Sequence, residues 1–139
     1  STACARGLSP VRRPADAGGM TYARNDAVGQ YGERVAARHL ESHGMTILDR
    51  RWTCRWGELD IVARDGATIV FCEVKTRTSQ RHGTGFEAVS SRKAQRLRRA
   101  ASAWLQAHGL EPLGVRIDVV SVRIPRRGGP VVERVSGVA

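Results

Sequence analysis

Three carboxylates and a lysine lie near the two ends of a largely apolar stretch of the sequence, GELDIVARDGATIVFCEVK, residues 57–75. They are Glu58, Asp60, Glu73 and Lys75, and most of their neighbours are β-branched, aliphatic or aromatic, as is typical of strands; Arg64 and Asp65 lie apart from them in the middle of the stretch. Carboxylates held close together in apolar surroundings repel one another unless a cation lies between them. A hard divalent ion such as Mg²⁺ or Mn²⁺ takes oxygen ligands and suits such a group. The stretch therefore predicts a metal site with a lysine beside it.

A β-hairpin would bring these residues together. Asp65-Gly66 is a strong signal for a two-residue turn, because both residue types tolerate positive φ. With that turn, Asp60 and Glu73 become diagonal neighbours on one face, about 5–8 Å apart at Cβ. A three-residue loop would instead place them on opposite faces. The predicted cross-strand pairs are Arg64 with Ala67, Ile61 with Val70, Asp60 with Phe71 and Glu58 with Glu73.

Side chains alternate between the two faces of a strand, so the predicted register also defines an apolar face. We expect that face to meet the core of the protein. Its members are Leu59, Ile61, Ala63, Val70, Cys72 and Val74. Glu58, Asp60, Glu73 and Lys75 share the opposite face, at the end away from the turn.

A helix is predicted before the hairpin, from Ala27 to about His43, with Asn25 or Asp26 as N-cap and Gly44 after its end. Its first turns contain Glu33, next to two glycines, Gly29 and Gly32, that could allow a close approach to the sheet. Glu33 could also be an ordinary exposed carboxylate that the helix dipole favours.

A second helix is predicted from Ser90 or Ser91 to Gly109, with a buried stripe along one side. The stripe consists of Ala94, Leu97, Ala101, Trp104 and Leu105. Basic residues gather beside it: Arg92, Lys93, Arg96 and Arg99. Such a face can be merely solvated, but in a basic protein it favours contact with phosphates rather than base reading. Arg77, directly after the hairpin, begins a polar loop (76–89, with Arg81 and His82) that could close over a ligand.

The remaining segments complete an α/β fold of order α-β-β-β-α-β, with a central mixed sheet and a helix on each side. Residues 45–52 and 115–124 are predicted strands, and residues 131–135 are an edge strand or a loose tail. Trp52 and Trp56 could stack on bases, although rim packing is the commoner role. The predicted organisation is a mobile basic tail (1–25, in which Met20 could be an alternative start), one domain (26–124) and a C-terminal segment (125–139).

Composition points to a polyanionic partner. The chain has 139 residues and a formal net charge of +10, which fits nucleic acid best. Only Lys75 and Lys93 among the 23 basic residues are lysines, so a lysine within the acidic cluster stands out. No signal peptide or apolar run of about 18 residues is visible, so we expect no contact with membranes. Three cysteines without a CxxC pattern suit the reducing cytoplasm.

The pattern of Asp60 followed by Glu73-Val74-Lys75 resembles the D…ExK signature of the restriction-endonuclease-like, or PD-(D/E)xK, nuclease superfamily. The fuller set of motifs resembles the YraN family of small bacterial proteins, related in fold to archaeal Holliday-junction resolvases. These motifs are GQYGE (29–33), GELDIVA (57–63), FCEVKTR (71–77) and RIDVV (116–120), and the resemblance covers residues 27–124. It implies a restriction-endonuclease-like fold and adds Glu33 to the metal site. Asp118 matches the last motif, yet it could equally be a structural salt-bridge partner.

Three functions fit this pattern. The first is a metal-dependent endonuclease acting on DNA, branched or junction DNA included. Asp60 and Glu73 would hold Mg²⁺ or Mn²⁺, Glu33 or Glu58 and the Val74 carbonyl would complete the shell, and Lys75 would orient the water or stabilise charge. The second is a nucleic-acid-binding accessory protein without turnover. The third is a buried ion-pair network around Lys75, which would leave costly excess negative charge. Symmetric cleavage of a junction would need a homodimer.

Overall fold

The computed structural model describes residues 20–78 and 90–138, with backbone only for residues 20–25. The expectations for residues 1–19, and those for Arg81 and His82, lie outside the described residues. Within them, no helix is both long and apolar enough to cross a membrane.

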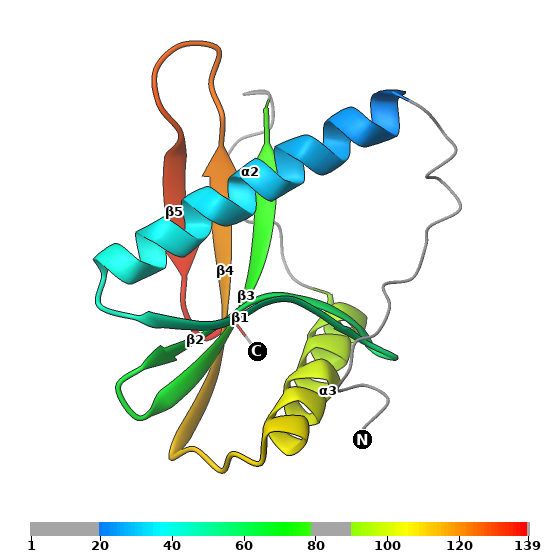
Figure 1. Cartoon of the computed structure of the whole chain (residues 1–139), viewed down its shortest axis with the longest axis vertical. Coiled ribbons are helices and arrows are strands. Elements are labelled where there is room, and N and C mark those ends of the chain that lie inside the picture. Colours follow the sequence, from blue (N-terminus) through cyan, green and yellow to red (C-terminus); the bar gives the residue numbers. More distant parts are fainter. Residues whose placement is uncertain (1–19, 79–89, 139) are drawn as a thin grey trace.

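The described residues form one five-stranded sheet and two helices (Figure 1). In chain order the elements are α2 (Met20–Ser42), β1 (Thr46–Cys54), β2 (Gly57–Asp65), β3 (Thr68–Arg77), α3 (Ser91–His108), β4 (Gly114–Arg123) and β5 (Val131–Val135). The strands lie side by side in the order β1-β2-β3-β4-β5. β3 and β4 are parallel and all other neighbours are antiparallel, so the sheet is mixed. This confirms the predicted α/β, restriction-endonuclease-like architecture and shows that residues 131–135 form an edge strand.

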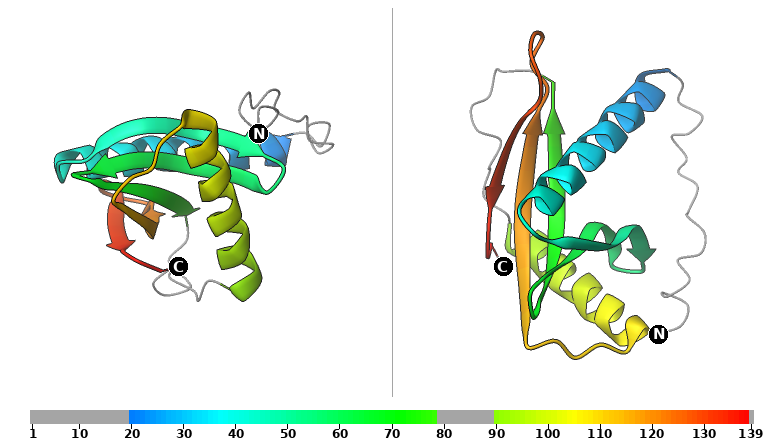
Figure 2. Two further views of the ribbon diagram at one scale, coloured as in Figure 1. Left: turned by 90° about the horizontal axis from the view of Figure 1, so that it is seen from below. Right: turned by 60° about the vertical axis from the view of Figure 1, so that its left-hand side comes forward.

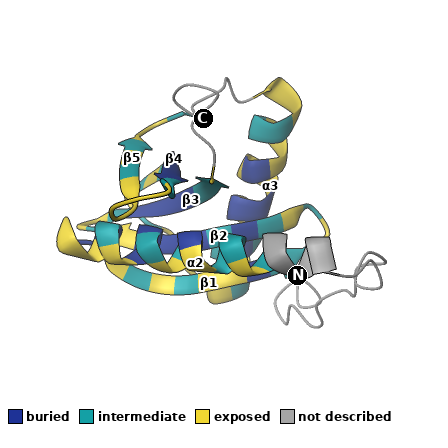
Figure 3. Cartoon of the chain, turned by 90° about the horizontal axis from the view of Figure 1, so that it is seen from above, coloured by how far each residue is buried: buried dark blue, intermediate teal, exposed yellow. Residues whose placement is uncertain are grey.

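The two helices cover opposite faces of the sheet (Figure 2). Ala36, Ala37 and Leu40 of α2 pack against one face, in a cluster that includes Ile61 and Val70. The other face packs against α3 through a second cluster, which contains Leu59, Val62, Phe71, Leu97, Ala101 and Trp104. Buried residues accordingly lie on the sheet and on the sides of the helices that meet it (Figure 3). The hairpin of β2 and β3 is thus enclosed by both layers.

The predicted register of the β2–β3 hairpin is wrong by two residues. The turn consists of Gly66 and Ala67, and β2 pairs Asp65 with Thr68 and Ile61 with Cys72. Gly66 has φ 64°, whereas Ala67 lies outside the positive-φ region. A two-residue hairpin with glycine at its first central position is a favoured arrangement, since the second position then accepts any L-residue. A shift of two residues keeps Asp60 and Glu73 on one face, and the pairing of the two strands ends at Ile61 and Cys72, directly next to these two acids.

The predicted apolar face of the hairpin is wrong at Leu59. Leu59 pairs with Trp52 of β1, and both side chains join the cluster under α3, whereas Ile61 and Ala63 pack under α2. Ile61 is the last residue of β2 that pairs with β3, so at Leu59 the strand pairs with β1 alone, and the Leu59 side chain joins Trp52 in the cluster under α3.

The first helix starts earlier than predicted, at Met20 instead of Ala27. Asp26 does not cap it, because its carboxylate accepts a hydrogen bond from Gln30 Nε2, one turn further along the same helix (2.9 Å). Residues 20–25 therefore belong to α2 and not to a tail.

The second helix has the predicted ends. Ser90 is the N-cap and accepts a hydrogen bond from the Lys93 backbone N–H (3.1 Å), and Gly109 follows the helix in the left-handed region. Leu97, Ala101 and Trp104 of the predicted stripe are buried, together with Ala100.

Candidate metal and nucleic-acid site

Three carboxylates from two elements converge beside the sheet. Glu33 of α2 and Glu58 and Asp60 of β2 each offer an oxygen, and these oxygens lie within 4.8 Å of one another. All three residues are partly buried. The residues present therefore suit a hard divalent cation, since they supply a set of oxygen ligands.

Gly32 explains how Glu33 reaches this place. A Cβ at Gly32 would overlap the side chain of Thr76 on β3, so only glycine lets α2 approach the strand here. A Cβ at Gly29 would meet nothing within 4 Å. One of the two predicted glycine contacts is therefore real, and it is the one adjacent to Glu33.

Asp60 is the most strongly perturbed carboxyl group of the cluster. Burial raises its pKa to about 8, and the nearby negative charge of Glu73 acts in the same direction. The backbone N–H of Val74 donates a hydrogen bond to Asp60 Oδ2 (2.8 Å), which opposes the shift. In the absence of a cation the Asp60 carboxyl is thus held protonated at neutral pH, which indicates that a positive charge would be favourable there.

Glu73 does not belong to the group of three but lies beside it. Its Oε2 forms an ion pair with Lys93 Nζ at 2.7 Å, and the Glu73 side chain is 14% exposed. Lys93 comes from the first turn of α3, where the Ser90 cap fixes the start of the helix. The sequence predicted that Lys93 contacts phosphate, whereas in the structure Lys93 forms an ion pair with Glu73, a predicted metal ligand.

Lys75 lies two residues after Glu73 on β3, so both side chains leave the same face of the strand. Among residues 20–78 and 90–138, no carboxylate lies within ion-pair distance of Lys75. The alternative of an ion-pair network centred on Lys75 is therefore wrong for the described part of the chain.

Arg51 of β1 is the site residue that sequence reasoning missed. Its Nε lies 3.5 Å from Glu33 Oε1 and 3.9 Å from Glu58 Oε2, and its guanidinium also lies 3.7 Å from Asp26. Burial raises the pKa of Glu33, and Arg51 opposes that shift. Arg51 also has a backbone φ of 53°, a conformation that residues other than glycine rarely adopt. No sequence signal distinguished it, because it is one arginine of many.

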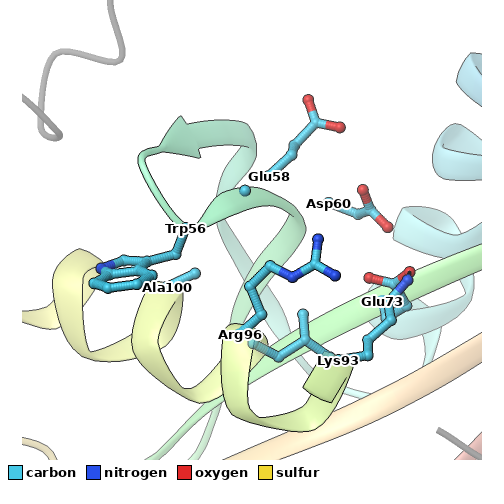
Figure 4. Close-up of a pocket in the computed structure, with 9 residues that line it drawn as sticks. Trp56, Glu58, Asp60, Glu73, Lys93, Arg96 and Ala100 are labelled. Atoms are coloured by element: carbon cyan, nitrogen blue, oxygen red, sulfur yellow. Dashed lines mark ion pairs between the residues drawn. The ribbon is translucent and has the colours of Figure 1, made fainter. Parts of the chain in front are cut away.

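A pocket of about 210 Å³ opens between the hairpin and α3. Its lining includes Glu58, Asp60 and Glu73 from the strands and Lys93 and Arg96 from the helix. In Figure 4, Asp60 and Glu73 lie toward one end of the pocket and Trp56 toward the other, with Arg96 between them. Carboxylates, cations and an aromatic ring thus surround one space.

The other predicted nucleic-acid contacts separate into two groups. Arg92, Arg96 and Arg99 are exposed on α3, as a phosphate-binding surface requires, whereas Arg77 at the end of β3 is only partly exposed. Of the two tryptophans weighed for base stacking, Trp52 is buried and Trp56 is partly exposed.

Asp118 has a structural role. It is fully buried on β4 and accepts hydrogen bonds from Arg116 (2.9 Å), from Arg134 (3.0 Å) and from the Gly137 backbone N–H (3.0 Å). These contacts tie β5 and the residues after it to the centre of the sheet. Of the two roles that the sequence left open for Asp118, the salt-bridge partner is confirmed.

Comparison with known proteins places these motifs in a family. Residues 32–122 match the model of "Uncharacterised protein family UPF0102". A UPF0102 protein of Kineococcus radiotolerans is 58% identical over 122 residues, which are 86% of this chain and 100% of that protein. A UPF0102 protein of Streptomyces coelicolor is 53% identical over 124 residues, 88% of this chain and 95% of that protein. These matches extend over the segments that supply Glu33, the hairpin and Lys93.

Proposed function

The chain belongs to protein family UPF0102, the YraN-like proteins, and we propose that it is a metal-dependent endonuclease that hydrolyses phosphodiester bonds in DNA. The observation that carries this proposal is the convergence of Glu33, Glu58 and Asp60, with their oxygens within 4.8 Å of one another. Arg51 lies near Glu33 and Glu58, but among the described residues no basic side chain forms an ion pair with Asp60, so a further cation would stabilise the three carboxylates. The same pocket contains the cations that a phosphate would need.

The residues divide the work as follows. Asp60, Glu58 and Glu33 would hold Mg²⁺ or Mn²⁺, with Glu73 and the Val74 carbonyl at the adjoining position. When bound, the ion would supply polarisation of a phosphoryl oxygen and a water of lowered pKa. Lys75 would orient that water or stabilise the charge that develops on the phosphate. Arg96 and Lys93 line the pocket and would hold the DNA strand in place.

Calorimetric titration of Mg²⁺ and Mn²⁺ into the wild type, Asp60→Asn and Asp65→Asn tests the site. Asp65 is a matched control, because it is a carboxylate at the far end of the same strand, where it contacts Arg116. We expect binding to be lost in Asp60→Asn and retained in Asp65→Asn. Equal binding by all three proteins contradicts the site.

Cleavage is tested separately on duplex, flap and four-way junction DNA with each ion. Lys75→Ala is expected to abolish cleavage while DNA binding remains. Full cleavage by Lys75→Ala or by Asp60→Asn would refute the mechanism.

A second function, binding of nucleic acid without turnover, is favoured by one observation. The Glu73 carboxylate is already engaged by Lys93 at 2.7 Å, so a predicted ligand is occupied by a protein cation. This alternative predicts stoichiometric DNA binding with no cleavage in Mg²⁺ or Mn²⁺. Turnover by the wild type that disappears in Lys75→Ala would exclude it.

A further inference from the structure

Trp56 lies in the two-residue connection between β1 and β2 and lines the same pocket as Asp60 and Glu73. Figure 4 shows its ring beside Ala100 of α3, at the side of the pocket away from the two acids. The side chain is partly exposed. An aromatic ring thus borders the space in which a phosphate would be cleaved.

The other two tryptophans of the chain differ from Trp56. Trp104 is buried and its Nε1 donates a hydrogen bond to Asp49 (2.9 Å), and Trp52 is buried against Leu59. Both have evident roles in joining the sheet to α3. Trp56 packs only partly buried against the same apolar cluster, and charged groups also lie over its ring.

Those charged groups are two guanidinium groups. The Cζ atoms of Arg55 and Arg99 each lie 4.7 Å from a ring centroid of Trp56, within the range of a cation–π contact. Both arginines are exposed to solvent. Arginines at the surface can leave the ring at small cost, and phosphates would attract them more strongly than the ring does.

Proteins that bind single strands combine a positively charged groove with aromatic rings on which bases stack. Inside a duplex both faces of each base are covered by its neighbours, so only an unpaired or unstacked base has a face to offer. Trp56, Arg55, Arg96 and Arg99 bring both elements of this mode together next to the carboxylates.

We propose that Trp56 is a stacking subsite for an unpaired nucleobase, and that Arg55 and Arg99 move from its ring to the flanking phosphates when DNA binds. This inference rests on the proposed function and names its substrate class: DNA with unpaired nucleotides beside the cleaved bond, such as a flap or an open branch point. Blunt duplex DNA is a poor ligand for the subsite.

The test is equilibrium binding in EDTA, where no cleavage occurs, of labelled blunt duplex and of the same duplex with a single-stranded flap. Trp56→Ala is expected to weaken binding of the flap DNA by about 5- to 150-fold, the range for loss of one base–aromatic stack. Binding of the blunt duplex should change less than about twofold. Trp56→Phe, which keeps a ring, should retain most of the affinity for the flap and verifies that the result does not come from misfolding.

Arg92→Ala is the matched control for charge, because Arg92 is exposed on α3 and does not line the pocket. This substitution should weaken binding of both DNAs by a similar factor. If Trp56→Ala weakens binding of both DNAs equally, or weakens binding of neither, the subsite is refuted while the nuclease proposal stands. If the selective loss occurs but the wild type cleaves no DNA in any divalent metal, the nuclease proposal fails and the subsite stands.

Discussion

The four carboxylates of the site have three different neighbours. Glu33 and Glu58 lie 3.5 and 3.9 Å from the Arg51 guanidinium. Asp60 accepts a hydrogen bond from the Val74 backbone N–H, and Glu73 forms an ion pair with Lys93. The ion pair of Glu73 is the shortest of these charge contacts. Protein cations thus balance part of the negative charge that a metal would otherwise balance alone.

Lys93→Met should therefore affect metal binding and cleavage in opposite directions. Removing the amine leaves Glu73 without its competing cation, so Mn²⁺ affinity without DNA should rise by up to about fivefold, the upper range for a solvent-screened ion pair. Cleavage should fall, because a cation lining the pocket is lost. Calorimetry and a cleavage assay measure the two effects, with Arg92→Met as control. Unchanged or weaker Mn²⁺ binding by Lys93→Met would contradict competition at Glu73.

The raised pKa of Asp60 makes metal affinity depend on pH. Burial and the Glu73 charge raise this pKa from 3.8 to about 8, and a metal ion needs the ionised carboxylate. Binding should therefore release a proton below pH 8, so Mn²⁺ affinity should rise from pH 6 to 8 and then level off. Titrations in buffers of different ionisation enthalpy measure the released proton. A flat profile would mean that Asp60 is not a ligand.

The same group affects the stability of the metal-free protein. Between about pH 4 and 8 the folded state retains a proton on Asp60 that the unfolded chain has lost, so stability falls as pH rises through this window. Asp60→Asn carries no titrating group and should lose less stability between pH 5 and 9. Thermal unfolding in EDTA makes the comparison. A steeper loss of stability in Asp60→Asn than in the wild type would contradict a raised pKa of Asp60.

At the scale of elements, the packing of α2 on β3 positions Glu33. Gly32→Ala should push the helix away from Thr76 and cost about 1–3 kcal/mol, as overpacking does. Gly29→Ala in the same helix has open space and should instead stabilise by roughly 0.5–1 kcal/mol, because alanine is the better helix former. Urea unfolding of both variants provides the measurement. Metal binding should weaken only in Gly32→Ala, and similar behaviour of the two variants would contradict a close approach at Gly32.

β4 and β5 are joined to the C-terminal segment through Asp118 and not through the metal site. Asp118→Ala leaves Arg116 and Arg134 without their buried partner and should cost about 3–5 kcal/mol. At a temperature where the variant is still folded, its metal binding should equal that of the wild type. Loss of metal binding by a folded Asp118→Ala protein would show that the last motif belongs to the site after all.

At the scale of the whole molecule, the charge is unevenly placed. The net charge is +10, yet Glu58, Asp60 and Glu73 line one pocket, with Glu33 close to the first two, and the exposed Arg96 of α3 lines the same pocket. Such a distribution would attract the DNA backbone over a wide surface while reserving the acidic centre for a metal ion. A nucleic-acid partner and a cytoplasmic location stay predictions from the composition.

The α3 surface makes a prediction about salt. Each duplex phosphate neutralised contributes about 0.9 to the slope of log affinity against log salt concentration. Arg96→Ala and Arg99→Ala should each lower the slope by about that amount, whereas Arg38→Ala on α2, an exposed arginine on the other layer, should not change it. Anisotropy titrations of duplex DNA between 50 and 200 mM salt measure the slopes, at concentrations where this dependence is steep (about 10³–10⁵-fold for 6–10 contacts). Equal slopes for all variants would contradict contact between α3 and the DNA phosphates.

Local sequence patterns were enough to predict the hairpin, the shared face of Asp60 and Glu73, and the ends of α3. These depend on local chemistry: the alternation of side chains along a strand, the φ that glycine allows, and the hydrogen bond of a serine cap. The two-residue shift of the hairpin arose because Gly66 could occupy either central position of the turn. A shift of two residues does not by itself change the face of a side chain, and Glu58, Asp60 and Glu73 line one pocket.

Which charged side chains contact one another depends on how the helices and strands pack together. Arg51, Glu33 and Lys93 come from β1, α2 and α3, and their distances to the acids of the hairpin depend on how those elements pack: on Gly32 against Thr76, and on the apolar clusters that hold each helix to its face of the sheet. Periodicity and turn signals describe neighbours along the chain. Contacts between elements far apart in sequence follow from the complementary shapes of their buried surfaces, which no local pattern encodes.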